Sequence, residues 1–179
     1  TLLFVSIGTL ITVIVQSSSA AMALTLTLLF NDVITFEIAA AMVLGENIGT
    51  TITAELASLV GNVHAKRSAR IHSMFNIVGV TWMLFLMPFF LSAIAYVMRT
   101  YFGVDPFDVS NGEAATLGLS AFHTVFNLTN VFLLIWFVPL LVKLAERTVK
   151  SKGEDDEVFK LEYIAGGITS TPELSLLEA

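Results

Sequence analysis

The sequence contains no cysteine and few charged residues. Only 13% of its 179 residues are Asp, Glu, Lys or Arg, whereas a soluble domain carries about 25%. The missing cysteines exclude a disulfide framework and a thiolate metal site. What the chain has instead is apolar: 55% of it is hydrophobic, and its mean hydropathy is +0.81. These values predict an integral membrane protein.

Positive charge is especially scarce in the first part of the chain, where no Lys or Arg precedes Lys66. No basic stripe is present, which argues against nucleic acid as a partner. Charged residues gather near the C-terminus and divide the chain into a membrane domain, 1–149, and a polar acidic tail, 150–179. The first residue already lies in an apolar run without Met or a signal peptide, so we interpret the chain as a piece of a longer polypeptide.

Two apolar segments, about 71–98 and 117–142, exceed the roughly 20 residues that a transmembrane helix needs. Both are too long for barrel strands and do not alternate. They predict two long transmembrane helices and an all-α fold. Basic residues precede the first segment and follow the second, while the loop between them is acidic. The positive-inside rule therefore predicts that both outer flanks, and with them the tail, are cytoplasmic.

The first third of the chain has three shorter apolar segments, 1–15, 20–30 and 33–44. They are separated by polar interruptions, of which the most distinctive are QSSS at 16–19 and GENIGTT at 45–51. Short apolar pieces with such interruptions are typical of re-entrant or discontinuous transporter helices. We therefore expect the backbone to break at both polar segments.

A helix break at QSSS would leave unpaired backbone groups at membrane depth, where they must line a cavity or be buried in protein. The free N–H groups at the start of the following helix suit an oxyanion. Freed carbonyl and hydroxyl oxygens suit a hard cation such as sodium. The residues alone leave a second interpretation open, because Ser and Thr also mediate close packing between membrane helices.

The succession QSSSA, GENIGTT and RIHSMFN resembles the sodium/phosphate cotransporter family, type II and its bacterial relatives. In that family QSSS occurs in each of two inverted repeats, with a G-x-N-I-G-T-T stretch downstream. One QSSS is present here, so the chain resembles the second repeat, one half of an inverted-repeat transporter, without the first. Its tail resembles the start of a helical domain like the phosphate-regulatory PhoU protein.

The resemblance implies a set of site residues. Phosphate binding is implied for Gln16, Ser17, Ser18 and Ser19. Sodium binding is implied for Gln16, Ser18, Ser19, Asn47, Thr50 and Thr51. Glu46 departs from the small residue that many relatives have, and an acid at membrane depth is usually functional. We interpret it as lying beside the site, either as a cation ligand or proton-linked group or as the lining of an aqueous vestibule.

The pattern H-x-x-F-N occurs twice, at His72–Asn76 and His123–Asn127. At this spacing, His and Asn share one helix face. We interpret the histidines as packing groups near the helix starts. The asparagines lie a turn deeper, which makes Asn76 and Asn127 candidates for a position beside the site. No G-x-S-x-G elbow is present, and no two histidines lie three or four residues apart, so neither an enzyme nor a metal site other than sodium is expected.

The function that the resemblance implies is import of inorganic phosphate with sodium as the co-transported ion. Two alternatives stay open: a regulatory membrane subunit that senses phosphate, and a sodium-coupled transporter of a related oxyanion. The expected location is the cell membrane, with several passes and a cytoplasmic tail. The expected partners are phosphate, the lipid bilayer, the missing first repeat and, as one alternative, further copies of the chain.

Overall fold

The computed structural model describes residues 1–151, and all the regular structure in that range is helical. The elements are α1 (Leu2–Val15), α2 (Ser18–Phe30), α3 (Phe36–Ser58), α4 (Val63–Val97), the π-helix η1 (Met98–Phe102), α5 (Gly112–Leu134), the 3₁₀ turn η2 (Ile135–Phe137) and α6 (Val138–Thr148). The all-α prediction is confirmed for this range. The expected tail domain, apart from Lys150 and Ser151, lies outside the described residues.

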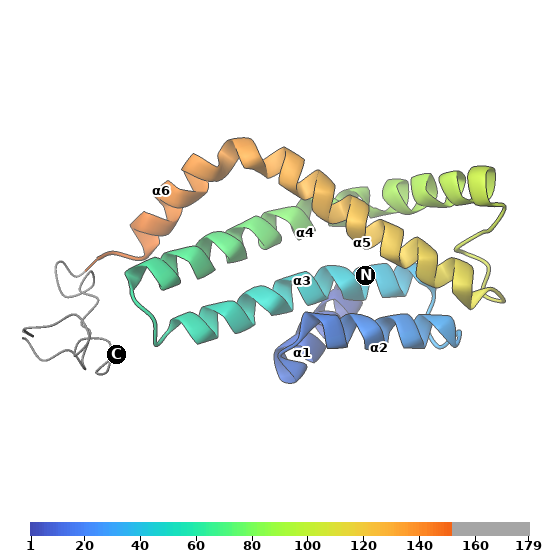
Figure 1. The fold of residues 1–179 in the computed structure, drawn as a ribbon, viewed down its shortest axis with the longest axis horizontal. Helices are drawn as coiled ribbons and strands as arrows, with labels where there is room; N and C mark the ends of the chain where they lie inside the picture. The colour runs from blue at the N-terminus through green and yellow to red at the C-terminus, as the bar shows by residue number, and fades with distance from the viewer. Residues whose placement is uncertain (152–179) are drawn as a thin grey trace, which may run out of the picture.

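Two continuous helical stretches, Val63–Phe102 and Gly112–Thr148, are long and apolar enough to cross a membrane. They run in opposite directions along the long axis of the molecule, and the second bends where α5 meets α6 (Figure 1). The bend coincides with the 3₁₀ turn and with a proline in the first turn of α6, where a missing N–H is tolerated. Both stretches contain the segments predicted from the sequence and extend beyond them.

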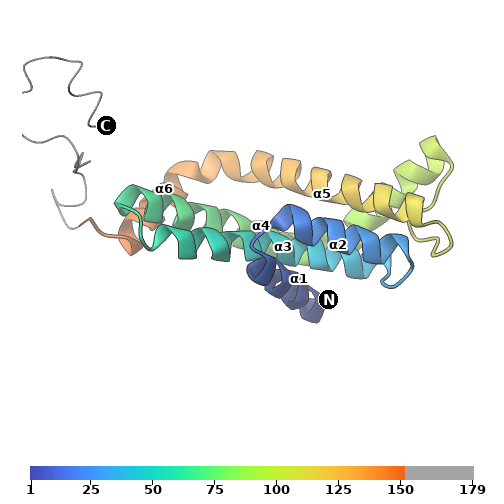
Figure 2. The same cartoon turned by 60° about the horizontal axis from the view of Figure 1, so that its bottom comes forward.

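The predicted break at QSSS is present and separates α1 from α2. Gln16 adopts a left-handed conformation with φ 56° and ψ 24°, and Ser17 is extended and caps α2. At 1.5 Å per residue, the 14 residues of α1 reach only about 21 Å, less than the roughly 30 Å of a bilayer core. The two helices form a hairpin whose tip lies beside the middle of α3 (Figures 1 and 2).

The predicted break at GENIGTT is wrong, because α3 runs unbroken from Phe36 to Ser58. Its glycines serve close helix packing instead. A Cβ at Gly45 would collide with the carbonyl of Val5 on α1, and one at Gly49 would lie 2.6 Å from Thr12 Cβ. The apolar segment 33–44 is therefore the first part of a 23-residue helix rather than a short separate piece.

The core forms around α3, which packs against α1, α2, α4 and α5. Between α4 and α5, the fully buried Asn130 accepts a hydrogen bond from Trp82 Nε1 at 3.1 Å and donates one to the carbonyl of Phe75 at 3.4 Å. Its side chain also fills the space above Gly79, where a Cβ would clash with it. These contacts of Asn130 fix the position of α5 against α4.

The two basic clusters predicted to share one side lie together at one end of the bundle. Arg67 at the start of α4 donates from Nε to the carbonyl of Val149 at 3.1 Å and lies 3.7 Å from Glu146. Nearby, Arg70 pairs with Glu55 of α3 at 3.0 Å. The turn between α2 and α3 and the loop between η1 and α5 lie at the opposite end (Figure 1).

Candidate functional site

A polar cavity of about 410 Å³ lies between the start of α2, the middle of α3 and α5. It is the place where the two polar segments singled out in the sequence meet. Its polar lining consists of Ser18, Ser19, Glu46, Asn47, Thr50 and His123. Met22, Leu26 and Val43 belong to its apolar lining. The side chains come from chain positions about 100 residues apart, so the fold creates the cavity.

The start of α2 supplies hydrogen-bond donors to this cavity. Ser17 uses its hydroxyl and its carbonyl to accept from the N–H groups of Ala20 and Ala21, at 3.3 and 3.0 Å. Within residues 1–151 no acceptor binds the N–H groups of Ser18 and Ser19 or the hydroxyl of Ser18. Free N–H groups at a helix start carry partial positive charge and favour an anion.

The wall formed by α3 supplies acceptors. Asn47 donates its amide to the carbonyl of Val43 at 3.1 Å, and Thr50 donates its hydroxyl to the carbonyl of Glu46 at 2.8 Å. Thr50 thus uses its only donor within α3 and Asn47 uses one of its two, and the oxygens of both side chains keep lone pairs for a ligand. Oxygen acceptors are what a hard cation requires. The cavity therefore has one side suited to an anion and one side suited to a cation.

Glu46 is the acidic residue of the cavity wall. Its side chain is buried, with 4% of the residue exposed, and its Oε1 accepts a hydrogen bond of 2.7 Å from the buried Thr25 of α2. This bond joins α2 to α3 beside the cavity. Glu46 also belongs to the lining of the cavity, a position that agrees with both interpretations from the sequence.

Several residues of the predicted site do not line the cavity. Gln16 is exposed at the hairpin tip, and Ser17 acts as the helix cap. Thr51 is buried, donates to the carbonyl of Ile48 at 2.8 Å and lines a separate hollow between α3 and α4. Asn76 and Asn127 donate to the carbonyls of His72 and His123, one turn earlier, at 3.3 and 2.8 Å.

His123 is the cavity residue that the sequence analysis assigned to packing. Because α4 begins at Val63 and α5 at Gly112, both histidines of the H-x-x-F-N pairs lie well inside their helices rather than near the starts. His123 reaches the polar cavity, whereas His72 lines a hollow between α3 and α4. The repeated pattern was the available signal, but it could not distinguish the two histidines.

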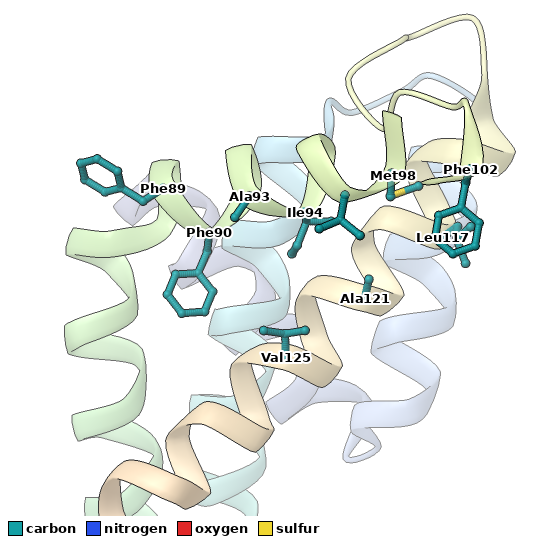
Figure 3. A pocket seen from close by; sticks show the side chains of 10 residues that line it. Phe89, Phe90, Ala93, Ile94, Met98, Phe102, Leu117, Ala121 and Val125 are labelled. Carbon is teal, nitrogen blue, oxygen red and sulfur yellow. The ribbon is translucent and has the colours of Figure 1, made fainter. Parts of the chain in front are cut away.

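A larger hollow of about 570 Å³ lies between the end of α4 and α5 (Figure 3). All its lining residues are apolar, among them Phe90, Ile94, Phe102, Leu117 and Val125. Binding an anion requires donors, and this hollow has none in its lining side chains. The smaller polar cavity at Ser18 is therefore the candidate functional site.

The described part of the chain is thus a helical protein with two potential membrane-spanning stretches and a two-sided polar cavity beside a broken helix pair. Residues 2–104 match the family model described as Na+/Pi-cotransporter. The chain belongs to the Na+/Pi-cotransporter family, which confirms the family resemblance of its motifs.

Individual relatives extend the match beyond these residues. YjbB of Salmonella typhimurium, whose name provisionally assigns it to inorganic phosphate export, is 28% identical over 173 residues, 97% of this chain and 29% of that protein. YqeW of Bacillus subtilis is 30% identical over 146 residues, 82% of this chain and 43% of that protein. Sodium-dependent phosphate transport protein 2B of Homo sapiens is 33% identical over 120 residues, which are 64% of this chain and 17% of that protein. The chain spans less than half of each relative, and no solved structure matches it.

Proposed function

We propose that this chain is part of a transporter that carries inorganic phosphate inward across the cell membrane together with sodium. Membership of the Na+/Pi-cotransporter family supports transport of phosphate rather than an enzymatic role. The observation that carries the proposal is that donors and acceptors lie on opposite sides of the polar cavity. The unpaired N–H groups at Ser18 and Ser19 face the anion, and the oxygens of Asn47 and Thr50 face the cation.

Electrostatics favour coupling to a cation. No Lys or Arg among residues 1–151 lines the cavity, so within this part of the chain the positive field for phosphate comes from helix dipoles and co-bound ions. Moving one charge across 100 mV changes the free energy by about 2.3 kcal/mol. Divalent phosphate entering a negative interior therefore costs about 4.6 kcal/mol per 100 mV. Two sodium ions cancel this cost, and a third makes uptake electrogenic.

The distribution of charge supports an orientation. Among residues 1–151, every Lys and Arg except Arg99 belongs to the end formed by the start of α4 and by α6, which we assign to the cytoplasm. Arg99 at the other end is paired with Asp105 at 2.7 Å. In this orientation the α1–α2 hairpin enters from the outside as a re-entrant pair, and its tip lies beside the middle of α3 (Figures 1 and 2).

The complete transporter, in this proposal, contains two inverted repeats, and the chain contributes the second within residues 1–149. The first repeat closes the open side of the cavity. The tail beginning at 150 enters the cytoplasm and leads into a PhoU-like domain. In this proposal, association with further copies of the chain and selection of phosphate over related oxyanions are properties of the whole protein.

Outward transport is the second candidate, because YjbB is named for phosphate export. A coupled carrier works in either direction according to its gradients, so the cavity suits both. A phosphate sensor that does not transport is the remaining rival. Such a sensor needs the same cavity, but the cavity need not open alternately to the two sides of the membrane.

The test is uptake of labelled phosphate by the complete protein in liposomes, with a sodium gradient imposed in either direction and with choline replacing sodium as the control. We expect accumulation that follows the sodium gradient and is competed by arsenate more strongly than by sulfate. Phosphate flux that is equal in choline contradicts sodium coupling. Binding without flux indicates the sensor.

A further inference from the structure

Glu46 is a buried carboxylate without a protein cation beside it. Its Oε1 accepts from Thr25, but no hydrogen bond or ion pair from residues 1–151 reaches Oε2. Glu46 is also part of the lining of the polar cavity. The carboxylate is therefore held by one neighbour and offers its second oxygen toward the cavity.

The charged groups of the described chain do not neutralise this carboxylate. Three of the four Arg side chains among residues 1–151 pair with Glu146, Glu55 and Asp105, all near the ends of the bundle. The fourth, Arg147, lies in the last turn of α6, at the same end as Arg67. His123 lines the same cavity but forms no ion pair with Glu46. An ionised carboxylate removed from water without a partner is strongly disfavoured. Either a proton or a cation from outside the chain relieves this cost, and the cavity beside Glu46 gives a cation access to the carboxylate.

The same carboxylate would repel phosphate bound a few ångströms away at the start of α2. A cation held by Glu46 removes this repulsion and adds an attraction of its own. The neighbouring acceptors suit such an ion, because Thr50 lies one turn after Glu46 on the same face and Asn47 lines the same wall. Oxygen ligands of this kind bind a small hard cation.

We propose that Glu46 is a ligand of one co-transported sodium ion, and that this ion makes phosphate binding possible in the cavity. The inference rests on the proposed function and adds a carboxylate ligand to it. Thr25 is a positioning residue: its 2.7 Å bond fixes Oε1 and leaves Oε2 to the ion. The Asn47 and Thr50 oxygens complete the protein's share of the site.

The experiment is calorimetric titration of phosphate into the complete purified protein over a range of sodium concentrations, at two pH values. We expect the slope of log affinity against log sodium concentration to fall by about one in Glu46→Gln. It should stay unchanged in Glu55→Gln, a matched change on the same helix away from the cavity. Glu46→Asp, which keeps the charge, should retain the slope and require several-fold more sodium.

Thr25→Val separates positioning from ligation, because it should raise the sodium requirement several-fold without changing the slope. A wild-type slope in Glu46→Gln overturns the inference. So does a Glu46→Gln protein that keeps the sodium slope and loses only a dependence on pH, because the partner of Glu46 is then a proton. If wild-type phosphate binding ignores sodium altogether, the proposed function fails as well, so the two failures are distinguishable.

Discussion

The hydroxyl of Thr9 on α1 donates to the carbonyl of Gly45 on α3 at 2.9 Å, and it lies equally close to the carbonyl of Val5 in its own helix. Such a contact is possible only where the two backbones nearly touch, since a Cβ at Gly45 would collide with Val5. Gly45 immediately precedes Glu46. The close crossing therefore sets both the position of the broken hairpin and the wall of the cavity.

Filling this crossing should destabilise the protein. We expect Gly45→Ala and Gly49→Ala each to lower the free energy of unfolding by at least about 1–3 kcal/mol, the usual cost of overpacking, because the clashing atoms at Gly45 are backbone and cannot rotate away. Ser92→Ala, at an exposed position of α4, is the control. Thermal unfolding in detergent measures the difference, and wild-type stability of Gly45→Ala would show that the crossing is looser than described.

Removing the Ser18 hydroxyl should weaken phosphate and sodium binding together. Ser18 lines the cavity, and its hydroxyl has no partner within residues 1–151. We expect Ser18→Ala to cost roughly 1–3 kcal/mol, as for a bond to a charged group. Because coupling between two ligands is reciprocal in free energy, titrations of either ligand should report the same coupling. Ser92→Ala again serves as the control, and a loss confined to one ligand would contradict a shared site.

Thr50 and Thr51 provide a matched pair, since Val replaces each with little change of shape. Thr50 lines the polar cavity, whereas Thr51 lines the hollow against α4. We expect Thr50→Val to raise the sodium concentration needed for half-maximal phosphate binding and Thr51→Val to leave it near the wild-type value. An equal effect of both changes would support the assignment of Thr51 implied by the family resemblance and count against the geometry.

His123 and His72 provide a second matched pair from the repeated H-x-x-F-N pattern. His123 lines the cavity and His72 does not. We expect His123→Leu to reduce phosphate affinity several-fold, because it replaces a polar wall by an apolar one, and His72→Leu to leave affinity unchanged. Phosphate titration measures both. Loss of affinity in His72→Leu alone would show that the cavity is not the binding site.

Cysteine labelling tests the orientation, and the native chain without cysteine makes it direct. Ser68 lies among the basic residues of α4, and Val109 lies in the acidic loop before α5. A membrane-impermeant thiol reagent added outside intact cells should label Val109→Cys and not Ser68→Cys. The opposite pattern would reverse the proposed topology and place the hairpin on the cytoplasmic side.

The sequence by itself determined the helical membrane character, the two long apolar stretches, the break at QSSS and the family. These depend on composition, on local polarity and on motifs within short segments, all of which are present in the order of residues. It also predicted that the basic clusters share one side, which the contact between Arg67 and Val149 bears out for the ends of the bundle.

Only the tertiary structure decided how the polar segments are used. The glycines of GENIGTT allow either a break or a close crossing, and the approach of α1 selects the crossing. Successive residues of a helix point about 100° apart, so the packing of α3 between its neighbours directs Thr50 into the cavity and Thr51 away from it. His123 joins Glu46 there because α5 lies across α3, a contact between residues far apart in the chain.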